Sequence, residues 1–192
     1  MAPILKTHAL AARRGFTLIE AMVVVMIVGI LAVLATYSVR KYVSSSKTSE
    51  AIEMIGAIKA AQESYKDETF GYFDVSQGNY ADYYPANSNY GRDKVAWGGT
   101  ATAAGSNGAR WSQLGLSSPG AFTFVFACVA NNDPTSTPAA PPAGDITIGS
   151  WPSAALGKPW YVVEAKADFE GNGIKTVFVG TSFTGDLFSA ND

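Results

Sequence analysis

The sequence is poor in the side chains on which many catalytic and metal sites depend. Histidine occurs once, as His8, and cysteine once, as Cys128, among 192 residues. A single cysteine excludes an intrachain disulfide. The sequence also lacks a glycine-rich phosphate loop with a lysine and a clustered basic face of the kind that nucleic-acid binding requires. We therefore expect no nucleic-acid partner, no cofactor and no small-molecule substrate.

Charge is scarce as well. Charged residues make up 16% of the chain and hydrophobic residues 47%, and Gly, Ser, Thr, Asn and Tyr are abundant. This composition is typical of an exported, β-rich domain, and the length suffices for one modest domain beyond an N-terminal segment. Cys128 lies in the apolar run Phe122 to Ala130. Because free cysteine is among the most buried residue types, we predict a core position for it.

Ionisable side chains are almost absent from Phe16 to Val39, where Glu20 is the only one. Roughly 20 apolar residues in a helix span the core of a bilayer, so this segment is predicted to cross a membrane. Lys6, Arg13 and Arg14 precede it with no acidic residue among them. The excess of positive charge predicts a single pass with a cytoplasmic N-terminus. A lone carboxylate in hydrocarbon costs at least about 3 kcal/mol, which favours a functional role for Glu20.

The string Gly15-Phe16-Thr17-Leu18-Ile19-Glu20 resembles the class III signal of type IV prepilins and pseudopilins. The resemblance is close from about residue 13 to 39 and looser to about residue 67. In that family, prepilin peptidase cuts after the glycine, here Gly15, and methylates the new N-terminal residue, here Phe16. The resemblance implies that Glu20 is the assembly carboxylate, which pairs with the charged N-terminus of a neighbouring subunit.

The resemblance also implies the fate of the chain. Residues 1–15 would be a leader peptide, and its removal would take His8 with it. The mature chain would then have no imidazole, which excludes Ser-His-Asp and Cys-His catalysis and a histidine-ligated zinc, so we do not expect an enzyme. The implied partners are the prepilin peptidase, the inner membrane before assembly, and copies of the chain and other pilins in a filament. The globular part would face the periplasm and later lie on a pilus or pseudopilus.

Two features depart from the pattern of many major pilins. About seven residues after Gly29, where those pilins carry a helix-breaking proline, this sequence has Thr36-Tyr37-Ser38. The lone Cys128 cannot close the C-terminal disulfide loop that many of them have. Both departures weigh weakly against a major adhesive pilin.

Two other readings of the N-terminus are open. Arg13-Arg14-Gly15-Phe16 also resembles a twin-arginine export signal, with Val33-Leu34-Ala35 as the cleavage site of a secretory peptide. Against this, Glu20 lies inside the hydrophobic region, and the helical pattern continues through the supposed site. A plain signal-anchored membrane domain does not account for the segment Phe16 to Glu20 so well. We favour the prepilin interpretation.

Beyond the leader we expect one helix from Phe16 to about Asp67, with a transmembrane and filament-core half (16–39) and an amphipathic half (40–71). Its second half carries an apolar stripe at three- and four-residue spacings, formed by Ala51, Met54, Ile55, Ile58, Ala61, Gln62 and Tyr65. Such a stripe predicts packing against the chain's own globular domain. Gly71 is expected to mark the end of the helix.

A connecting loop is expected over residues 72–120. Its tyrosines present either an adhesive surface or loop packing on the sheet, and we favour packing; they are Tyr72, Tyr80, Tyr83, Tyr84 and Tyr90. An antiparallel sheet is expected over residues 121–192, with strands at Ala121–Ala130, Asp145–Trp151, Trp160–Asp168 and Ile174–Phe183, and an extension at Gly185–Phe188. Gly171-Asn172-Gly173 would supply the hairpin turn. The predicted fold class is therefore α+β and pilin-like, a long helix packed on a four-stranded antiparallel sheet.

One candidate ion site remains. Asp168, Glu170 and Asn172 place oxygen atoms at every second position before a glycine, like the opening of a calcium loop. Val179 stands where an EF-hand requires a glutamate, so we favour a polar hairpin tip and no metal. The sequence predicts a type IV pilus subunit, major or minor. The alternatives are a pseudopilin of type II secretion and a membrane-anchored binding protein that does not polymerise.

Overall fold

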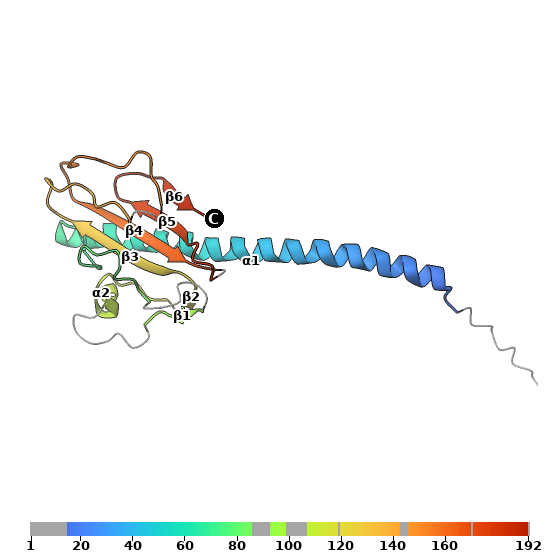
Figure 1. Ribbon diagram of the computed structural model, residues 1–192. Helices are drawn as coiled ribbons and strands as arrows, with labels where there is room; N and C mark the ends of the chain where they lie inside the picture. Colours follow the sequence, from blue (N-terminus) through green and yellow to red (C-terminus); the bar gives the residue numbers. More distant parts are fainter. Residues whose placement is uncertain are drawn as a thin grey trace, which may run out of the picture. The chain divides into compact units, whose positions relative to one another are not determined.

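The computed structural model describes residues 15–85, 93–98, 107–118, 120–142, 146–169 and 171–191 (Figure 1). Its elements are α1 (Leu18–Thr69), β1 (Val95–Ala96), α2 (Asn107–Gln113), β2 (Ala121–Phe122), β3 (Val125–Asn131), β4 (Trp160–Ala167), β5 (Thr176–Thr181) and β6 (Leu187–Ala190). Two compact units share α1: the N-terminal unit ends at Ser44, and the head unit runs from Ser45 to Asp192. The predicted α+β layout of a long helix and a four-stranded antiparallel sheet is confirmed.

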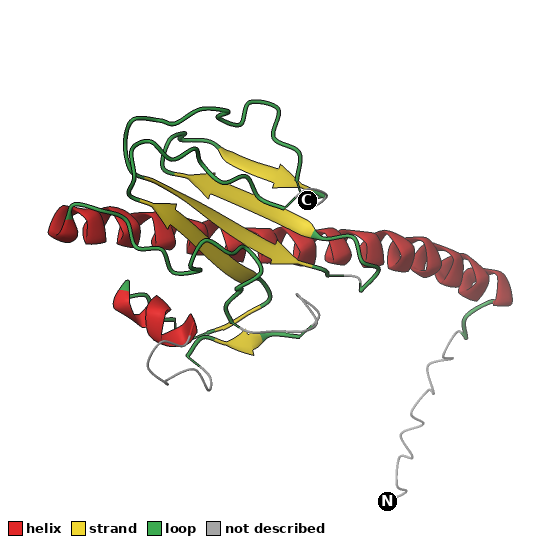
Figure 2. Cartoon of the chain, turned by 60° about the vertical axis from the view of Figure 1, so that its left-hand side comes forward, coloured by secondary structure: helices red, strands yellow, loops and turns green. Residues whose placement is uncertain are grey.

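The sheet of the head unit has the strand order β3-β4-β5-β6, with every neighbour antiparallel. Figure 2 shows its strands crossing the second half of α1. The predicted stripe forms the contact: Ala51, Met54, Ile55, Ile58 and Gln62 are buried, while Ala61 and Tyr65 pack at its margin. Gly180 on β5 makes this approach possible, because a Cβ there would lie 2.8 Å from Cγ2 of Ile55.

The opposite face of the sheet carries a second hydrophobic core. Tyr80, Tyr83 and Trp160 are buried there beside the outward valines of β3, β4 and β5. The chain between β3 and β4 covers this face through its partly buried side chains, which are Ala139, Ile146, Ile148, Trp151 and Leu156. The sheet is thus covered on both sides, as its almost fully buried strands require.

Three strand predictions need correction. The expected strand 121–130 is divided into β2 and β3, and between them the backbone N–H of Thr123 donates to the Glu50 carboxylate at 2.5 Å. The expected strand at 145–151 is wrong, since residues 146–151 form no strand. Their alternating apolar side chains instead cover the second core. The fourth strand is β6, which the sequence suggested only as a terminal extension.

The connection between α1 and the sheet is more ordered than expected. It contains α2 and β1, which pairs with β2, and neither was predicted. The tyrosines within its described part are buried (Tyr72, Tyr80, Tyr83 and Tyr84), which confirms packing over an adhesive surface; Tyr90 lies outside the described residues.

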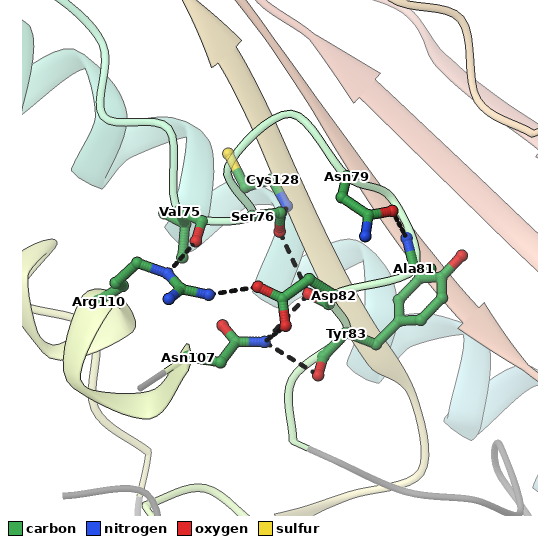
Figure 3. Close-up of polar contacts among 9 residues, drawn as sticks. All are labelled: Val75, Ser76, Asn79, Ala81, Asp82, Tyr83, Asn107, Arg110 and Cys128. Carbon is green, nitrogen blue, oxygen red and sulfur yellow. Dashed lines mark hydrogen bonds and ion pairs between the residues drawn. The ribbon is translucent and has the colours of Figure 1, made fainter. Parts of the chain in front are cut away.

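Polar contacts fix this connection against the sheet (Figure 3). Arg110 on α2 forms an ion pair with Asp82 and donates from Nε to the Val75 carbonyl at 2.5 Å. Asn107 donates from Nδ2 to Asp82 Oδ1 at 2.9 Å. The backbone N–H of Ser76 donates to the carbonyl of Cys128 at 2.9 Å, so the connection also occupies the outer edge of β3. This edge is thereby protected from pairing with another strand.

The helix α1 ends at Thr69, and the residue that leaves it in a left-handed conformation is Phe70, with φ 63°. Gly71, which the sequence suggested as the end of the helix, is not left-handed. The small residue at 71 serves a close approach instead, because a Cβ there would lie 2.8 Å from the Asn132 side chain. That amide binds the backbone of Tyr72 on both sides: Oδ1 accepts from its N–H at 2.7 Å, and Nδ2 donates to its carbonyl at 2.9 Å.

Candidate functional site

The candidate site lies where α1 begins. Residues 15–17 are not helical, and α1 starts at Leu18. Thr17 is the N-cap: its Oγ1 accepts from the N–H of Glu20 at 3.3 Å, and its carbonyl accepts from the N–H of Ala21 at 3.1 Å. This cap stops the helix before the Gly15–Phe16 bond. The bond therefore lies in exposed, non-helical chain.

Glu20 lies in the first turn of α1 and is exposed. Thr17 and Glu20 stand at the two positions of a capping box, and a carboxylate is favoured at a helix N-terminus by the aligned peptide dipoles. The three residues predicted for processing and assembly, Gly15, Phe16 and Glu20, therefore gather at one end of a single helix. Phe16 itself is 81% exposed.

The helix that follows presents apolar side chains on all sides. Leu18–Val39 is 22 residues long with a mean hydropathy of 2.8, and none of it is buried. Every large apolar side chain in this span is at least half exposed. Among the described residues it is the one helix long and apolar enough to cross a membrane. A helix that is apolar on all sides is typical of a membrane span or of a segment packed among other helices.

The hairpin considered for calcium uses its oxygens internally. Asp168 accepts from the N–H of Gly171 at 2.7 Å through Oδ1 and from the N–H of Gly173 at 2.9 Å through Oδ2. Asn172 Oδ1 accepts from the N–H of Ile174 at 2.8 Å. Glu170 lies outside the described residues. These bonds give Asp168 and Asn172 a role in shaping the turn, in line with the polar hairpin tip that the sequence favours, and the expectation of no metal stays a prediction.

Cys128 occupies the core, as predicted. Its side chain is fully buried, and burial raises the pKa of the thiol to about 12. Gln62 donates to the sulfur from Nε2 at 3.1 Å and to the Phe73 carbonyl at 2.7 Å, and its Oε1 accepts from the Phe73 N–H at 2.9 Å. A protonated thiol in this setting is unreactive.

The sequence did not predict a buried polar cluster formed by Tyr83, Glu164 and Lys166. On β4, Glu164 is fully buried and Lys166 nearly so, and the hydroxyl of Tyr83 lies between them. That hydroxyl donates to Glu164 Oε2 at 3.2 Å and accepts from Lys166 Nζ at 3.1 Å. The signal in the sequence was the pair of opposite charges two residues apart within an otherwise apolar strand.

Comparison with known proteins finds similarity in the N-terminal segment that contains Gly15, Phe16 and Glu20. A family model, the prokaryotic N-terminal methylation motif, matches residues 10–36. The type IV major pilin protein PilA of Myxococcus xanthus is 46% identical over 63 residues, which are 33% of this chain and 29% of that protein. The type II secretion system core protein G of Pseudomonas aeruginosa is 47% identical over 64 residues, 33% of this chain and 45% of that protein.

The fimbrial protein EcpC of Eikenella corrodens is 45% identical over 53 residues, 28% of this chain and 35% of that protein. The chain thus matches less than half the length of each of these relatives. No solved structure matches it.

Proposed function

We propose that this chain, which carries a prepilin-type N-terminal segment, is a structural subunit that assembles into a helical filament of the type IV pilus class. One observation carries the proposal. An exposed, non-helical Gly15–Phe16 bond is followed by Glu20 in the first turn of α1, within the exposed apolar span Leu18–Val39. Its relatives are pilins, fimbrial proteins and a secretion-system core protein, which supports a structural rather than a catalytic role.

The proposed mechanism follows from the resemblance of this segment to prepilin signals. Prepilin peptidase cuts after Gly15 on the cytoplasmic side and methylates Phe16. The span Leu18–Val39 holds the subunit in the inner membrane, with the head unit in the periplasm. In the filament, the same apolar surface packs against the helices of other subunits.

Glu20 gives assembly its electrostatic driving force. A carboxylate in hydrocarbon without a partner costs at least about 3 kcal/mol. The positive end of its own helix offsets only part of this cost, roughly 0.3 to 1 kcal/mol. Pairing with the N-terminal ammonium of a neighbouring subunit removes the isolated charge from both chains. A subunit entering the filament out of register would leave both charges unpaired.

Glu20→Ala tests this mechanism. We expect the leader to be removed normally, because the cut lies on the other side of the Thr17 cap, while filament yield falls by roughly two orders of magnitude for a loss of about 3 kcal/mol. Intact-mass spectrometry of the membrane fraction reports cleavage and methylation, and the pellet of sheared filaments reports assembly. The control is Gly15→Ala, which replaces the residue at the cut and is expected to leave an unprocessed chain. Normal filaments from Glu20→Ala would contradict the assembly role.

A pseudopilin of type II secretion is the alternative that a specific observation favours. The core protein G of one such system is among the relatives, at 47% identity over 64 residues. Both machines use the same N-terminal segment, so the phenotype of a deletion separates them. Loss of surface filaments with normal secretion supports the pilus, and loss of secreted proteins supports the pseudopilus. A membrane-anchored protein that does not polymerise would keep its function in the Glu20→Ala variant.

A further inference from the structure

Phe70, at the end of α1, combines two unfavourable features. Its side chain is 89% exposed, the highest value among the exposed large hydrophobic residues of the structure as described. Its backbone is left-handed, with φ 63°. A single exposed apolar side chain is ordinary on a protein surface. A bulky aromatic residue held in this backbone conformation is not, and such strain concentrates at functional positions.

The local geometry shows that glycine or asparagine would serve better for folding. The N–H of Phe70 donates to the carbonyl of Lys66 at 2.8 Å, which is the hydrogen bond of a left-handed helix cap. Helices usually place Gly, or sometimes Asn, at this position because a Cβ is strained there. With so much of its surface exposed, the ring gains little from the described part of its own chain. Folding of one subunit therefore does not explain a phenylalanine at position 70.

A cavity in the same head unit has the chemistry to receive an aromatic ring. It has a volume of about 600 Å³ and lies between α1 and the segment that runs from α2 to β2. Met54, Ala57 and Phe122 give it apolar surface, and its remaining lining is Ser46, Ser49, Glu50, Glu53, Ser117 and Ser118. A second cavity, of about 520 Å³, is lined by polar residues apart from Ala81 and suits a ring less well.

The ring and the cavity lie at separate places on one head unit. From Met54 to Phe70 the helix advances roughly 24 Å, so the ring cannot enter the cavity of its own subunit. A projecting group and a complementary cavity at different places on one surface make a head-to-tail contact, which repeats into an open helical array when it does not close into a ring. We propose that Phe70 of one copy inserts into the cavity of another copy and joins neighbouring head units. This inference rests on the proposed filament.

The charges around the contact define its ionic-strength dependence. Asp67 and Glu68 are exposed beside Phe70, and Glu50 and Glu53 line the cavity. Lys94 pairs with Glu50 at 3.2 Å and offsets one of these charges. Because the two sides carry the same sign, burial of the ring provides the attraction. Added salt therefore strengthens the contact by screening the repulsion.

Substitutions at Phe70 distinguish its effect on the stability of the head unit from its effect on filament assembly. Phe70→Asn is expected to raise the Tm of the head unit by roughly 2 to 4 °C, because asparagine tolerates the left-handed backbone. The same variant should lose on the order of tenfold in filament yield. Phe70→Ala keeps the strain and should also lose filaments, while Phe70→Tyr should keep them. Thermal unfolding in detergent and the sheared-filament pellet are the measurements. Normal filaments from Phe70→Asn would overturn the proposal.

Cross-linking tests the position of the contact while leaving Phe70 in place. Thr69→Cys and Ser117→Cys, combined in one chain, should give a disulfide-linked ladder in filaments after mild oxidation. The matched control pairs Thr69→Cys with Ala154→Cys, an exposed alanine in the chain that covers the other face of the sheet, and should give none. The native Cys128 is fully buried and does not compete.

The outcomes distinguish the two proposals. A ladder from the first pair alone supports the inserted ring. Filaments that form without this ladder, or with equal ladders from both pairs, overturn the inserted ring and leave the filament proposal standing. If the unsubstituted chain forms no filament or pseudopilus, the proposed function fails and the inserted ring fails with it.

Discussion

At the scale of single residues, two side-chain amides set the path of the chain out of α1. Gln62 binds both backbone groups of Phe73, and Asn132 binds both backbone groups of Tyr72. Neither backbone position has a partner strand there, so these amides supply the hydrogen bonds that a ladder would otherwise give. The two residues come from opposite sides of the connection, one from α1 and one from the segment after β3. They hold the start of the connection at a fixed place on the sheet.

Alanine substitutions at two glycines distinguish a glycine needed for close packing from one that only adds backbone flexibility. In Gly180→Ala the new Cβ would meet Ile55 at 2.8 Å between helix and sheet, so we expect a loss of about 1 to 3 kcal/mol in the free energy of unfolding. Gly56→Ala is the matched change, because nothing lies within 4 Å of a Cβ at that helical position. The Gly56→Ala variant should gain about 0.8 to 1 kcal/mol in the free energy of unfolding. Chemical denaturation followed by circular dichroism measures both, and equal effects would show that helix–sheet contact does not select Gly180.

At the scale of elements, β4 depends on a buried group of opposite charges. Lys166→Met removes the buried positive charge but leaves the Glu164 carboxylate buried beside the Tyr83 hydroxyl. We therefore expect a loss of about 3 to 5 kcal/mol in the free energy of unfolding. The double variant Glu164→Leu, Lys166→Met should recover most of this loss, because well-packed apolar residues often replace a buried pair without cost. Urea unfolding of the two variants measures the coupling. A double variant less stable than Lys166→Met would show that the charges themselves hold β4 in place.

Sequence patterns predicted those elements whose side-chain contacts repeat at a regular spacing. The stripe from Ala51 to Tyr65 could be placed because an amphipathic helix repeats its contacts every three or four residues. Residues 146–151 could not, because alternation of apolar side chains looks the same whether a segment joins a sheet or covers one. Helix α2 was missed because its 7 residues are too few for a period to stand out, and its position depends on Arg110 and Asp82, which are far apart in the sequence.

The residues proposed for processing and assembly could be picked out for a different reason, and their roles stay predictions. Gly15, Phe16 and Glu20 belong to one short string, so no tertiary contact is needed to bring them together. The group of Tyr83, Glu164 and Lys166 joins two segments about eighty residues apart, and its burial follows only from the folded sheet. Phe70 was missed because its sequence context marks a helix end at Gly71, while its left-handed backbone is visible only in the structure.

At the scale of the whole molecule, the exposed apolar surface is divided unequally between the two units. Among the exposed large hydrophobic residues, those up to Val43 fall in the N-terminal unit, whereas the head unit contributes Ile52, Phe70, Ile174 and Leu187. The head unit has its own two cores, on the two faces of one sheet. Apart from those four residues, the exposed large apolar side chains are therefore separate from the side chains that form the two cores of the head unit.

A chain that begins at Ser45 tests this division. It lacks the apolar span, and the helix residues that pack on the sheet begin at Ala51, so we expect a soluble, folded head with a cooperative unfolding transition. The full mature chain should instead remain in the membrane pellet after carbonate extraction. Sedimentation velocity should give a monomer for the head at micromolar concentration, because a lone aromatic contact is too small for a stable interface. An aggregated or unfolded head would show that the helix before Ser45 contributes to folding as well as to anchoring.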